Sequence, residues 1–377
     1  MQTNFELKRH NTMKIFDVMR ARESVSRKEL ASLTGLSWGS VSAISAELLQ
    51  KGIAVAEKEA SAGGRPAEQL TLAPDKFLQL GVDINSVGLN FVIVNLRGKT
   101  LQSALLPLES RDKDELLQTL FSQTEKLLKE NTGVIGINLS MQGKINKRTG
   151  VSLRTNFFKD WKDIPLVDIF TEKFALPTKL YHDPDCLLYY HLQNDPRLRG
   201  KNDGFVIRLD DGIGMARLLG GKLYEASEEA SFELGHTISE RNGRICACGK
   251  RGCLEAYASL RGMKEIYAEK VQNAGEDFIE ALKNGEYKAH AIVQEATERL
   301  GVAIANLFTL SAPEFILLDG GLLAQFPYLY EDIQTSVKNA LNSDCNLLCA
   351  SYNREAPANG ACLITIEKTT EELLFHL

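Results

Sequence analysis

Apolar positions in the first fifty residues recur at the three- and four-residue spacing of amphipathic helices. They predict a helix from Asn11 to Arg22, a second helix after Ser26 and a third after Ser37. Glu29 stands three residues after Ser26, as in a capping box, and Gly35 lies in the turn before the third helix. A helix, a short glycine turn and another helix predict a helix-turn-helix; an ordinary three-helix bundle is the alternative.

Two short alternating segments follow the third helix. IAVAEKE and EQLTLA predict paired strands, and SAGGRPA connects them. Glycine and proline alone would make a surface hairpin, but Arg65 adds a cation that suits the electronegative minor groove of DNA. The pattern therefore predicts a winged helix-turn-helix over residues 1–75.

The third predicted helix supplies most of the DNA-binding candidates. In a helix-turn-helix this helix enters the major groove, where small polar side chains near its start approach bases and phosphates. Val41, Ile44 and Leu48 form its apolar stripe. The candidates are the polar and aromatic residues judged to lie off this stripe, together with the helix cap and the wing cation: Ser37, Trp38, Ser40, Ser42, Ser45 and Arg65.

From Phe77 the pattern changes to longer apolar runs that alternate with helices. LQLGVDI, LNFVIVNL, TLQSALLPL, VIGINLS and TKLYHD predict strands, with helices at 114–130, near 168–174 and after Pro184. GFVIRLDDGIGMARLLGGKLY begins a second set of strands. The two similar halves predict a duplicated α/β body with lobes at 76–190 and 191–356, the C-terminal helix 357–377 joining the first lobe. Ligands usually bind in the cleft between such lobes.

Composition narrows the class of protein. The chain has 377 residues, 44% of them hydrophobic, and a net charge of −5, which argues against binding nucleic acid by bulk charge. Residues 1–75 alone are slightly basic, with ten Lys plus Arg against nine Asp plus Glu. Because no apolar run approaches the roughly 20 residues that span a bilayer and the start lacks a secretory signal, we expect a cytoplasmic protein without a membrane partner.

Three of the seven cysteines lie within ICACGKRGC. An odd number of cysteines in a reducing compartment argues against a disulfide framework. Cys246, Cys248 and Cys253 with His236 would suit a closed, structural tetrahedral Zn²⁺ site; chance clustering is the alternative. The remaining four are expected to be buried small apolar residues: Cys186, Cys345, Cys349 and Cys362.

Two carboxylates flank this predicted metal loop. Glu233 precedes His236 by three residues, and Glu255 follows Cys253 by two. Carboxylates and imidazole are groups that hydrogen-bond vicinal sugar hydroxyls. If one ring nitrogen of His236 binds zinc, the other faces a ligand. The loop therefore predicts a sugar site positioned by the metal.

Taken together, these segments resemble the ROK family of repressors and sugar kinases, in particular the repressor branch related to xylose, N-acetylglucosamine and glucose-phosphotransferase regulators. The resemblance covers nearly the whole chain, including GGRP, LGVDI, ELGH, CACGKRGCLE and NLFTLSAPEFILLDGGLL. It implies an actin-like, hexokinase-type pair of α/β lobes. It also implies sugar contacts from Glu233, His236 and Glu255, and zinc bound by His236 and the three clustered cysteines.

The chain departs from the family's kinases at both phosphate turns. The kinase turn Asp-x-Gly-Gly-Thr reads Asp-Ile-Asn-Ser-Val at 83–87, without either glycine. The second turn carries Asp210 and Asp211, whose carboxylates would repel a triphosphate. We therefore expect no ATP and no kinase activity. Gly320 and Gly321 are expected to close a strand-to-helix turn.

The kinase base is an Asp preceded by Asn, whereas this chain has His182 and Asp183. The resemblance implies that Asp183 accepts a hydrogen bond from a sugar hydroxyl and that His182 changes the pattern of donors and acceptors. Asn156, in TNFFKDW, is a further sugar-binding candidate.

The leading hypothesis is a sugar-responsive transcriptional regulator, expected to be a repressor of carbohydrate-utilisation genes. A homodimer or dimer of dimers, paired through the second lobe, would leave operator DNA when a sugar or sugar phosphate binds. Activation instead of repression remains open. Two other hypotheses are an ATP-dependent sugar kinase with a fused DNA-binding domain and a constitutive DNA-binding protein that has lost its ligand.

Overall fold

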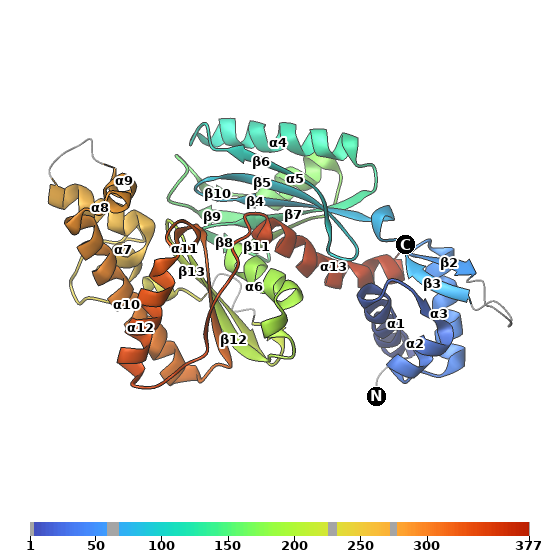
Figure 1. Cartoon of the computed structure of the whole chain (residues 1–377). Helices are drawn as coiled ribbons and strands as arrows, with labels where there is room; N and C mark the ends of the chain where they lie inside the picture. The colour runs from blue at the N-terminus through green and yellow to red at the C-terminus, as the bar shows by residue number, and fades with distance from the viewer. Residues whose placement is uncertain (1–3, 59–67, 225–231, 272–276, 377) are drawn as a thin grey trace.

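The N-terminal domain consists of three helices and a small antiparallel sheet. The computed structural model describes residues 4–58, 68–224, 232–271 and 277–376. Its first helices are α1 (Asn4–Ala21), α2 (Arg27–Thr34) and α3 (Trp38–Gln50), and its sheet has the order β1-β3-β2, formed by β1 (Val25–Ser26), β2 (Ala54–Lys58) and β3 (Glu68–Leu72). This arrangement, on the right in Figure 1, fits a helix-turn-helix. Arg65 and the rest of the predicted wing tip lie outside the described residues.

Local sequence signals set the ends of these helices. Ser26 and Glu29 form the predicted capping box, and Gly35 ends α2 with a left-handed φ of 70°. Ser37 caps α3 by accepting from the backbone N–H of Ser40. The helix α1 begins at Asn4 instead of the predicted Asn11, because the polar first turns carry none of the apolar periodicity on which that prediction relied.

The first lobe is built on a five-stranded sheet of order β11-β7-β4-β5-β6. Its strands are β4 (Leu78–Ile84), β5 (Gly88–Asn95), β6 (Thr100–Pro107), β7 (Val134–Met141) and β11 (Thr178–His182). The helices α4 (Lys113–Glu130) and α5 (Leu166–Phe174) pack on one face, and α13 (Ala356–His376) packs on the other (Figure 1). Because both faces are covered, every residue of β4 and β5 is buried.

A second five-stranded sheet has the matching order β14-β13-β12-β15-β16. Its strands are β12 (Asp203–Leu209), β13 (Ile213–Leu219), β14 (Lys222–Leu223), β15 (Phe315–Asp319) and β16 (Leu347–Cys349). In both sheets an antiparallel meander of three strands is followed by two parallel strands. The matching topology agrees with the predicted duplication.

Helices cover the second sheet on both sides. The helix α6 (Asp183–Asn194) packs on one face through Leu187 and Leu188. The other face carries the larger core, to which most of the remaining helices contribute: α7 (Glu255–Ala258), α8 (Leu260–Val271), α9 (Phe278–Lys283), α10 (Tyr287–Ser311), α11 (Gly321–Gln325) and α12 (Tyr328–Leu341). Among the described residues no helix is both long and apolar enough to cross a membrane.

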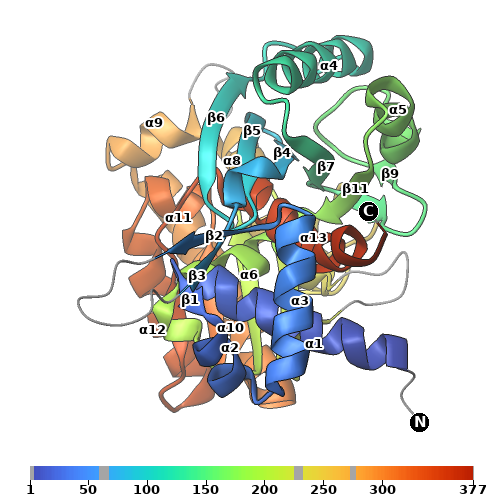
Figure 2. The same ribbon diagram turned by 90° about the vertical axis from the view of Figure 1, so that its right-hand side faces the viewer.

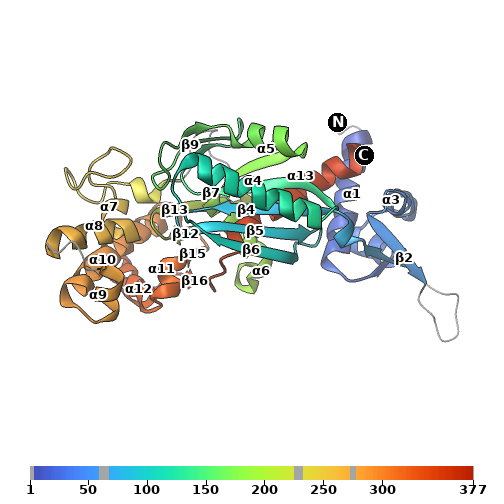
Figure 3. The same ribbon diagram turned by 90° about the horizontal axis from the view of Figure 1, so that it is seen from above.

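Two features at the edges of the first lobe position the ligand site and the N-terminal domain. A small sheet of β8 (Lys144–Asn146), β9 (Val151–Arg154) and β10 (Lys162–Ile164) extends from one edge; these strands are too short for an apolar pattern and were not predicted. The helix α13 packs onto the first lobe, because Gly81 has no side chain and the carbonyl of Ala358 can approach β4. Figures 2 and 3 show α13 reaching α1, which it contacts.

Candidate functional site

A cavity of about 700 Å³ lies between the lobes, and we name it the first cavity. All six residues predicted to contact a sugar line its wall: Asn156, His182, Asp183, Glu233, His236 and Glu255. They come from four separate segments: the loop after β9, the junction of β11 and α6, the segment before Cys246, and the start of α7. The fold therefore brings together side chains that are up to 99 positions apart in the chain.

Asp183 belongs to a buried ion-pair network with Arg208 and Asp210. It is 2% exposed, and its Oδ2 accepts from Nη1 of Arg208 at 2.8 Å. Arg208 also donates through Nε to Asp210 at 2.6 Å. Burial raises the pKa of Asp183, and the nearby charges of Arg208 and His182 partly offset this. Burial lowers the pKa of Arg208, but Asp210 and Asp183 outweigh it and hold that pKa well above its usual value.

Glu255 is held as a fixed acceptor. Its Oε2 accepts from the backbone N–H of Ile213 at 3.0 Å, and its Oε1 accepts from Arg261 at 2.6 Å. Glu233 lies nearer the opening, with its Oε2 3.9 Å from Nε2 of His236. The two predicted carboxylates therefore share the first cavity with the imidazole, as the sequence led us to expect.

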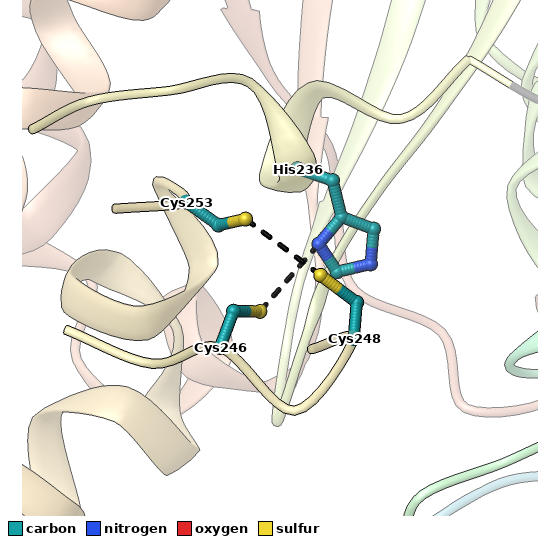
Figure 4. Close-up of side chains that lie close together, drawn as sticks. All are labelled: His236, Cys246, Cys248 and Cys253. Atoms are coloured by element: carbon teal, nitrogen blue, oxygen red, sulfur yellow. Dashed lines mark hydrogen bonds between the residues drawn. The ribbon is translucent and has the colours of Figure 1, made fainter. Parts of the chain in front are cut away.

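His236 and three cysteines form a cluster of possible metal ligands (Figure 4). One donor atom from each of His236, Cys246, Cys248 and Cys253 lies within 4.8 Å of all the others. Nδ1 of His236 is 3.7 Å from Sγ of Cys246, and Sγ of Cys248 is 3.7 Å from Sγ of Cys253. Nε2 of the same imidazole is the atom nearer Glu233. This group could hold a metal ion with one face of His236 still turned toward the cavity.

The loop around the cluster depends on a glycine. Gly252 has a φ of 78°, and a Cβ at this position would overlap the carbonyl group of Glu240. The carbonyl of Gly252 accepts from the N–H groups of Ser239 and Glu240 at 2.7 and 3.1 Å. The close passage of two chain segments places Cys253 beside the other sulfur atoms.

A second cavity, of about 440 Å³, lies next to the first, and Arg208 and Asp211 line both. Its wall includes the turn of residues 85–88, which follows β4 and overlaps the stretch at 83–87 compared above with the first phosphate turn of kinases. Oδ1 of Asn85 accepts from the N–H groups of Val87 and Gly88 at 2.9 and 3.1 Å. Oε1 of Gln142 accepts from the N–H of Ser86 at 3.2 Å. The three successive amide groups of this turn are thus bonded within the chain.

The strand-to-helix turn at Gly320 and Gly321 also borders the second cavity. Gly320 has a φ of 131° between β15 and α11, which agrees with the expected turn. The N–H of Gly321 donates to Asp210 at 2.6 Å. Asp210 therefore accepts from both a guanidinium and a backbone amide.

The predicted DNA-binding residues divide into exposed and buried ones. Trp38 is 60% exposed, Ser37 is exposed, and Ser40 and Ser42 are half-buried. Ser45 was wrongly included, because it is 0% exposed and faces the core of the domain. Three of the exposed residues of α3 that the prediction missed are small, namely Gly39, Ala43 and Ala46, and Gln50 at the end of the helix is exposed as well.

Other differences concern the cysteines and the cationic wall. Cys186 and Cys362 are buried as predicted, whereas Cys345 and Cys349 are half-buried and lie in a loop and in β16. The prediction of burial fails for the latter two because both sit near a sheet edge. Sequence reasoning also missed the cations in the first cavity: Arg111, Lys144, Arg154, Arg208, Lys250, Arg261 and Lys264. A signal for one was present, since Arg208 interrupts an otherwise apolar strand.

Comparisons with known proteins show the family of the chain. The family described as "ROK family" matches residues 79–368. The xylose repressor of Bacillus spizizenii is 25% identical over 354 residues, with 91% of each chain covered. The glucokinase of Halalkalibacterium halodurans is 27% identical over 269 residues, covering 64% of this chain and 80% of that protein.

A solved structure extends the likeness to the N-terminal domain. The crystal structure of a ROK family transcriptional regulator, described as a homologue of the Escherichia coli Mlc protein, has a TM-score of 0.79 at 23% identity and covers 98% of each chain. The likeness shows the same fold for the body and the N-terminal domain together. On the match to its body, the chain belongs to the ROK family.

Proposed function

We propose that this protein is a sugar-responsive DNA-binding transcriptional regulator, most simply a repressor. The observation that carries the proposal is the first cavity, because its wall contains all six side chains predicted to contact a sugar. The same chain also has an N-terminal domain that fits a helix-turn-helix. The xylose repressor matches 91% of this chain, whereas the glucokinase matches 64% of it. The regulators therefore account for more of the molecule than the kinases do.

The sugar would be held by two carboxylates that are already oriented and by a histidine that lacks one hydrogen bond. Asp183 and Glu255 are oriented by Arg208 and Arg261, so each can accept from a hydroxyl without reorganising. Nδ1 of His182 is buried, and no described residue gives it a hydrogen bond. A buried polar atom of this kind usually has a partner, and a rotation of the His182 ring toward the first cavity, which this residue lines, would let a ligand hydroxyl supply one. We propose the same role for Asn156 and Glu233 nearer the opening.

The DNA would be read by the exposed face of α3. The small residues Gly39, Ala43 and Ala46 leave this face low beside the exposed Trp38, so that the helix can lie deep in a major groove. Ser37, Ser40 and Ser42 stand at or near the start of α3, where backbone amides also favour phosphate. We propose that a dimer presents two such helices to paired half-sites and that Arg65 adds a minor-groove contact.

We propose that the metal is a structural Zn²⁺ bound by His236, Cys246, Cys248 and Cys253. Tetrahedral Zn²⁺ with bonds of about 2.3 Å to sulfur implies ligand atoms about 3.8 Å apart. The His236–Cys246 and Cys248–Cys253 separations of 3.7 Å agree with that geometry. Zinc bound at Nδ1 of His236 would leave Nε2 for the ligand and fix its protonation.

Loss of kinase activity is supported by the second cavity. The amides of residues 86–88 donate to Asn85 and Gln142, so they are not available to phosphate oxygens. Oδ2 of Asp183 already accepts from Nη1 of Arg208, so this oxygen is not free to take a proton from a hydroxyl. We therefore propose that ATP is neither bound nor consumed, and that the cavity has kept recognition of the sugar without the transfer of phosphate.

A thermal-shift screen of sugars and sugar phosphates tests this proposal. Ligands that raise the melting temperature would next be added to the protein bound to a DNA duplex that the protein itself has selected from a random library. At least one hit should release the duplex. ATP consumption with any sugar in a coupled assay would instead favour the kinase, and a protein that selects DNA but responds to no sugar would favour the constitutive DNA-binding protein.

A further inference from the structure

One turn of the first lobe is built into the N-terminal domain. The turn joins β5 to β6 at residues 95–99. Leu96 is 2% exposed and belongs to the same apolar cluster as Ile15 and Leu72. Its N–H donates to the carbonyl of Pro74 at 3.2 Å. A side chain of the ligand-binding body thus completes the core of the domain that carries α3.

The next residue of the turn holds the end of α1. Nη1 of Arg97 donates to the carbonyls of Arg20 at 3.0 Å and Arg22 at 2.7 Å, and Nη2 donates to that of Glu23 at 3.2 Å. The last carbonyls of a helix lack partners within it, and the helix dipole favours a cation there. Because the guanidinium is planar and contacts three carbonyls, it fixes the direction of α1 as well as its position.

The turn is itself rigid. Oδ1 of Asn95 accepts from the N–H groups of Arg97 and Lys99 at 3.0 and 3.1 Å. Nδ2 of Asn95 donates to Asp75, in the segment that links the N-terminal domain to β4, at 2.7 Å. If the turn moves, the end of α1 and the segment that links the N-terminal domain to β4 therefore move with it.

Two elements connect this turn to the cavities. The strand β5 ends at the turn and begins at Gly88, which lines the second cavity. The helix α13 begins beside Pro357 at the same cavity, and Asn359 on it donates to the carbonyl of Gly98 at 3.1 Å and to Oγ1 of Thr100 at 2.9 Å. Figure 3 shows α13 continuing from there to α1. The turn thus lies where the two elements from the cleft meet the N-terminal domain.

We propose that the turn of residues 95–99 is the joint that fixes the orientation of the DNA-reading helix relative to the ligand-binding body, with Arg97 as its positioning residue. Domains of one chain usually move relative to each other unless their interface is large and apolar. Here a buried leucine and a three-way guanidinium contact restrict that movement. A change in the angle between the lobes therefore turns α1 and the helices packed on it. This inference rests on the proposed DNA-binding function.

The dependence of DNA affinity on half-site separation tests the joint. The wild type, Arg97→Ala, Arg97→Lys and the control Lys99→Ala are compared; Lys99 has an exposed side chain in the same turn. The duplex selected by the wild type is rebuilt with its half-sites moved apart in steps up to half a helical turn. The wild type and Lys99→Ala should lose at least about tenfold in affinity, because rigid helices must match one spacing. Both Arg97 variants should lose no more than about threefold across the same steps, with unchanged affinity for a single half-site.

X-ray scattering of the same four proteins without DNA gives an independent result. The Arg97 variants should show a larger maximum dimension and a broader distance distribution than the wild type and Lys99→Ala, at an unchanged content of helix. Wild-type dependence on spacing or wild-type scattering in both Arg97 variants would overturn the joint. If the wild type selects no DNA, the proposed function fails, and the scattering still decides whether Arg97 fixes the domain.

Discussion

The two cavities of the body differ in what their walls leave for a ligand. In the first cavity, Nδ1 of His182 is buried with no hydrogen bond from any described residue, and Asp183 and Glu255 are oriented toward the space between the lobes. In the second, the amides of residues 86–88 are already bonded to Asn85 and Gln142. The first cavity is thus open to hydrogen bonding with a ligand, whereas the amides at the second cavity are already bonded within the chain.

Arg208 connects the two cavities. It lines both cavities and pairs with Asp183 on one side and Asp210 on the other. Where the two cavities meet, this chain therefore has a buried guanidinium paired with two carboxylates. Under the proposed function, this ROK body keeps its sugar-binding groups while Asn85 and Gln142 occupy the amides that a phosphate would need.

The largest effect should come from the metal loop, which supports the first cavity and not the second. Cys248→Ser should reduce bound zinc from one ion per chain to almost none and abolish sugar binding, because His236 and the start of α7 lose their anchor. Metal analysis and calorimetry measure both. Cys345→Ser, which replaces a half-buried cysteine outside the cluster, is the matched control. Full sugar affinity in a zinc-free Cys248→Ser protein would show that the metal loop does not support the first cavity.

Asp183→Asn should weaken sugar binding by about ten- to a hundredfold, because a hydrogen bond to a charged acceptor contributes roughly 1.5–3 kcal/mol. The control Asp344→Asn changes a carboxylate whose side chain is 90% exposed. Calorimetric titration measures the affinity, and thermal unfolding without ligand shows whether the variant is folded. An unchanged affinity would remove Asp183 from the site.

Opening the second cavity should have a smaller effect. Asn85→Gly removes the side chain that occupies the amides of Val87 and Gly88, so ATP affinity should rise by about threefold to tenfold from a very low value. Sugar affinity should stay the same. Fluorescent nucleotide binding measures the change, and Asn131→Gly, at the end of α4, is a control. If Asn85→Gly leaves ATP binding as weak as before, the occupied amides are not what excludes the phosphate.

Sugar affinity should also depend weakly on pH. The pKa of Asp183 is raised by burial, so the carboxylate gains its proton at a higher pH than an ordinary aspartate as the pH falls. Since the ionised form is the better acceptor, affinity should fall in that range, above the usual value of 3.8. Titrations at several pH values measure this. The same decline in Asp183→Asn would assign it to another group.

Several features of the fold and of the candidate site could be predicted from residues that are close in sequence. The capping box at Ser26 and Glu29, the apolar runs of β4 and β5, and the three clustered cysteines depend on neighbours, and all appear where predicted. Ser45 was also readable: it stands four residues after Val41 and three before Leu48, which places it on the apolar stripe.

The remaining features depend on contacts between distant residues. Arg208 meets Asp183 across 25 positions, and Gln142 meets Ser86 across 56. Asn85 is an exception, because an asparagine commonly accepts from backbone N–H groups two and three positions later, and this local signal was not used in the prediction. The sequence indicated that the phosphate turn had lost its glycines, but the structure was needed to show that its amides had gained other partners.

The most direct test of the sugar-responsive regulator measures release of a selected DNA duplex by the sugar that stabilises the zinc-loaded protein. Fluorescence anisotropy is recorded for the wild type and Asp183→Asn with increasing sugar. We expect a saturating sugar to lower the wild type's affinity for DNA by at least about tenfold and to leave Asp183→Asn bound at the same concentrations. A sugar that binds the first cavity without changing the affinity for DNA would contradict the proposed regulator.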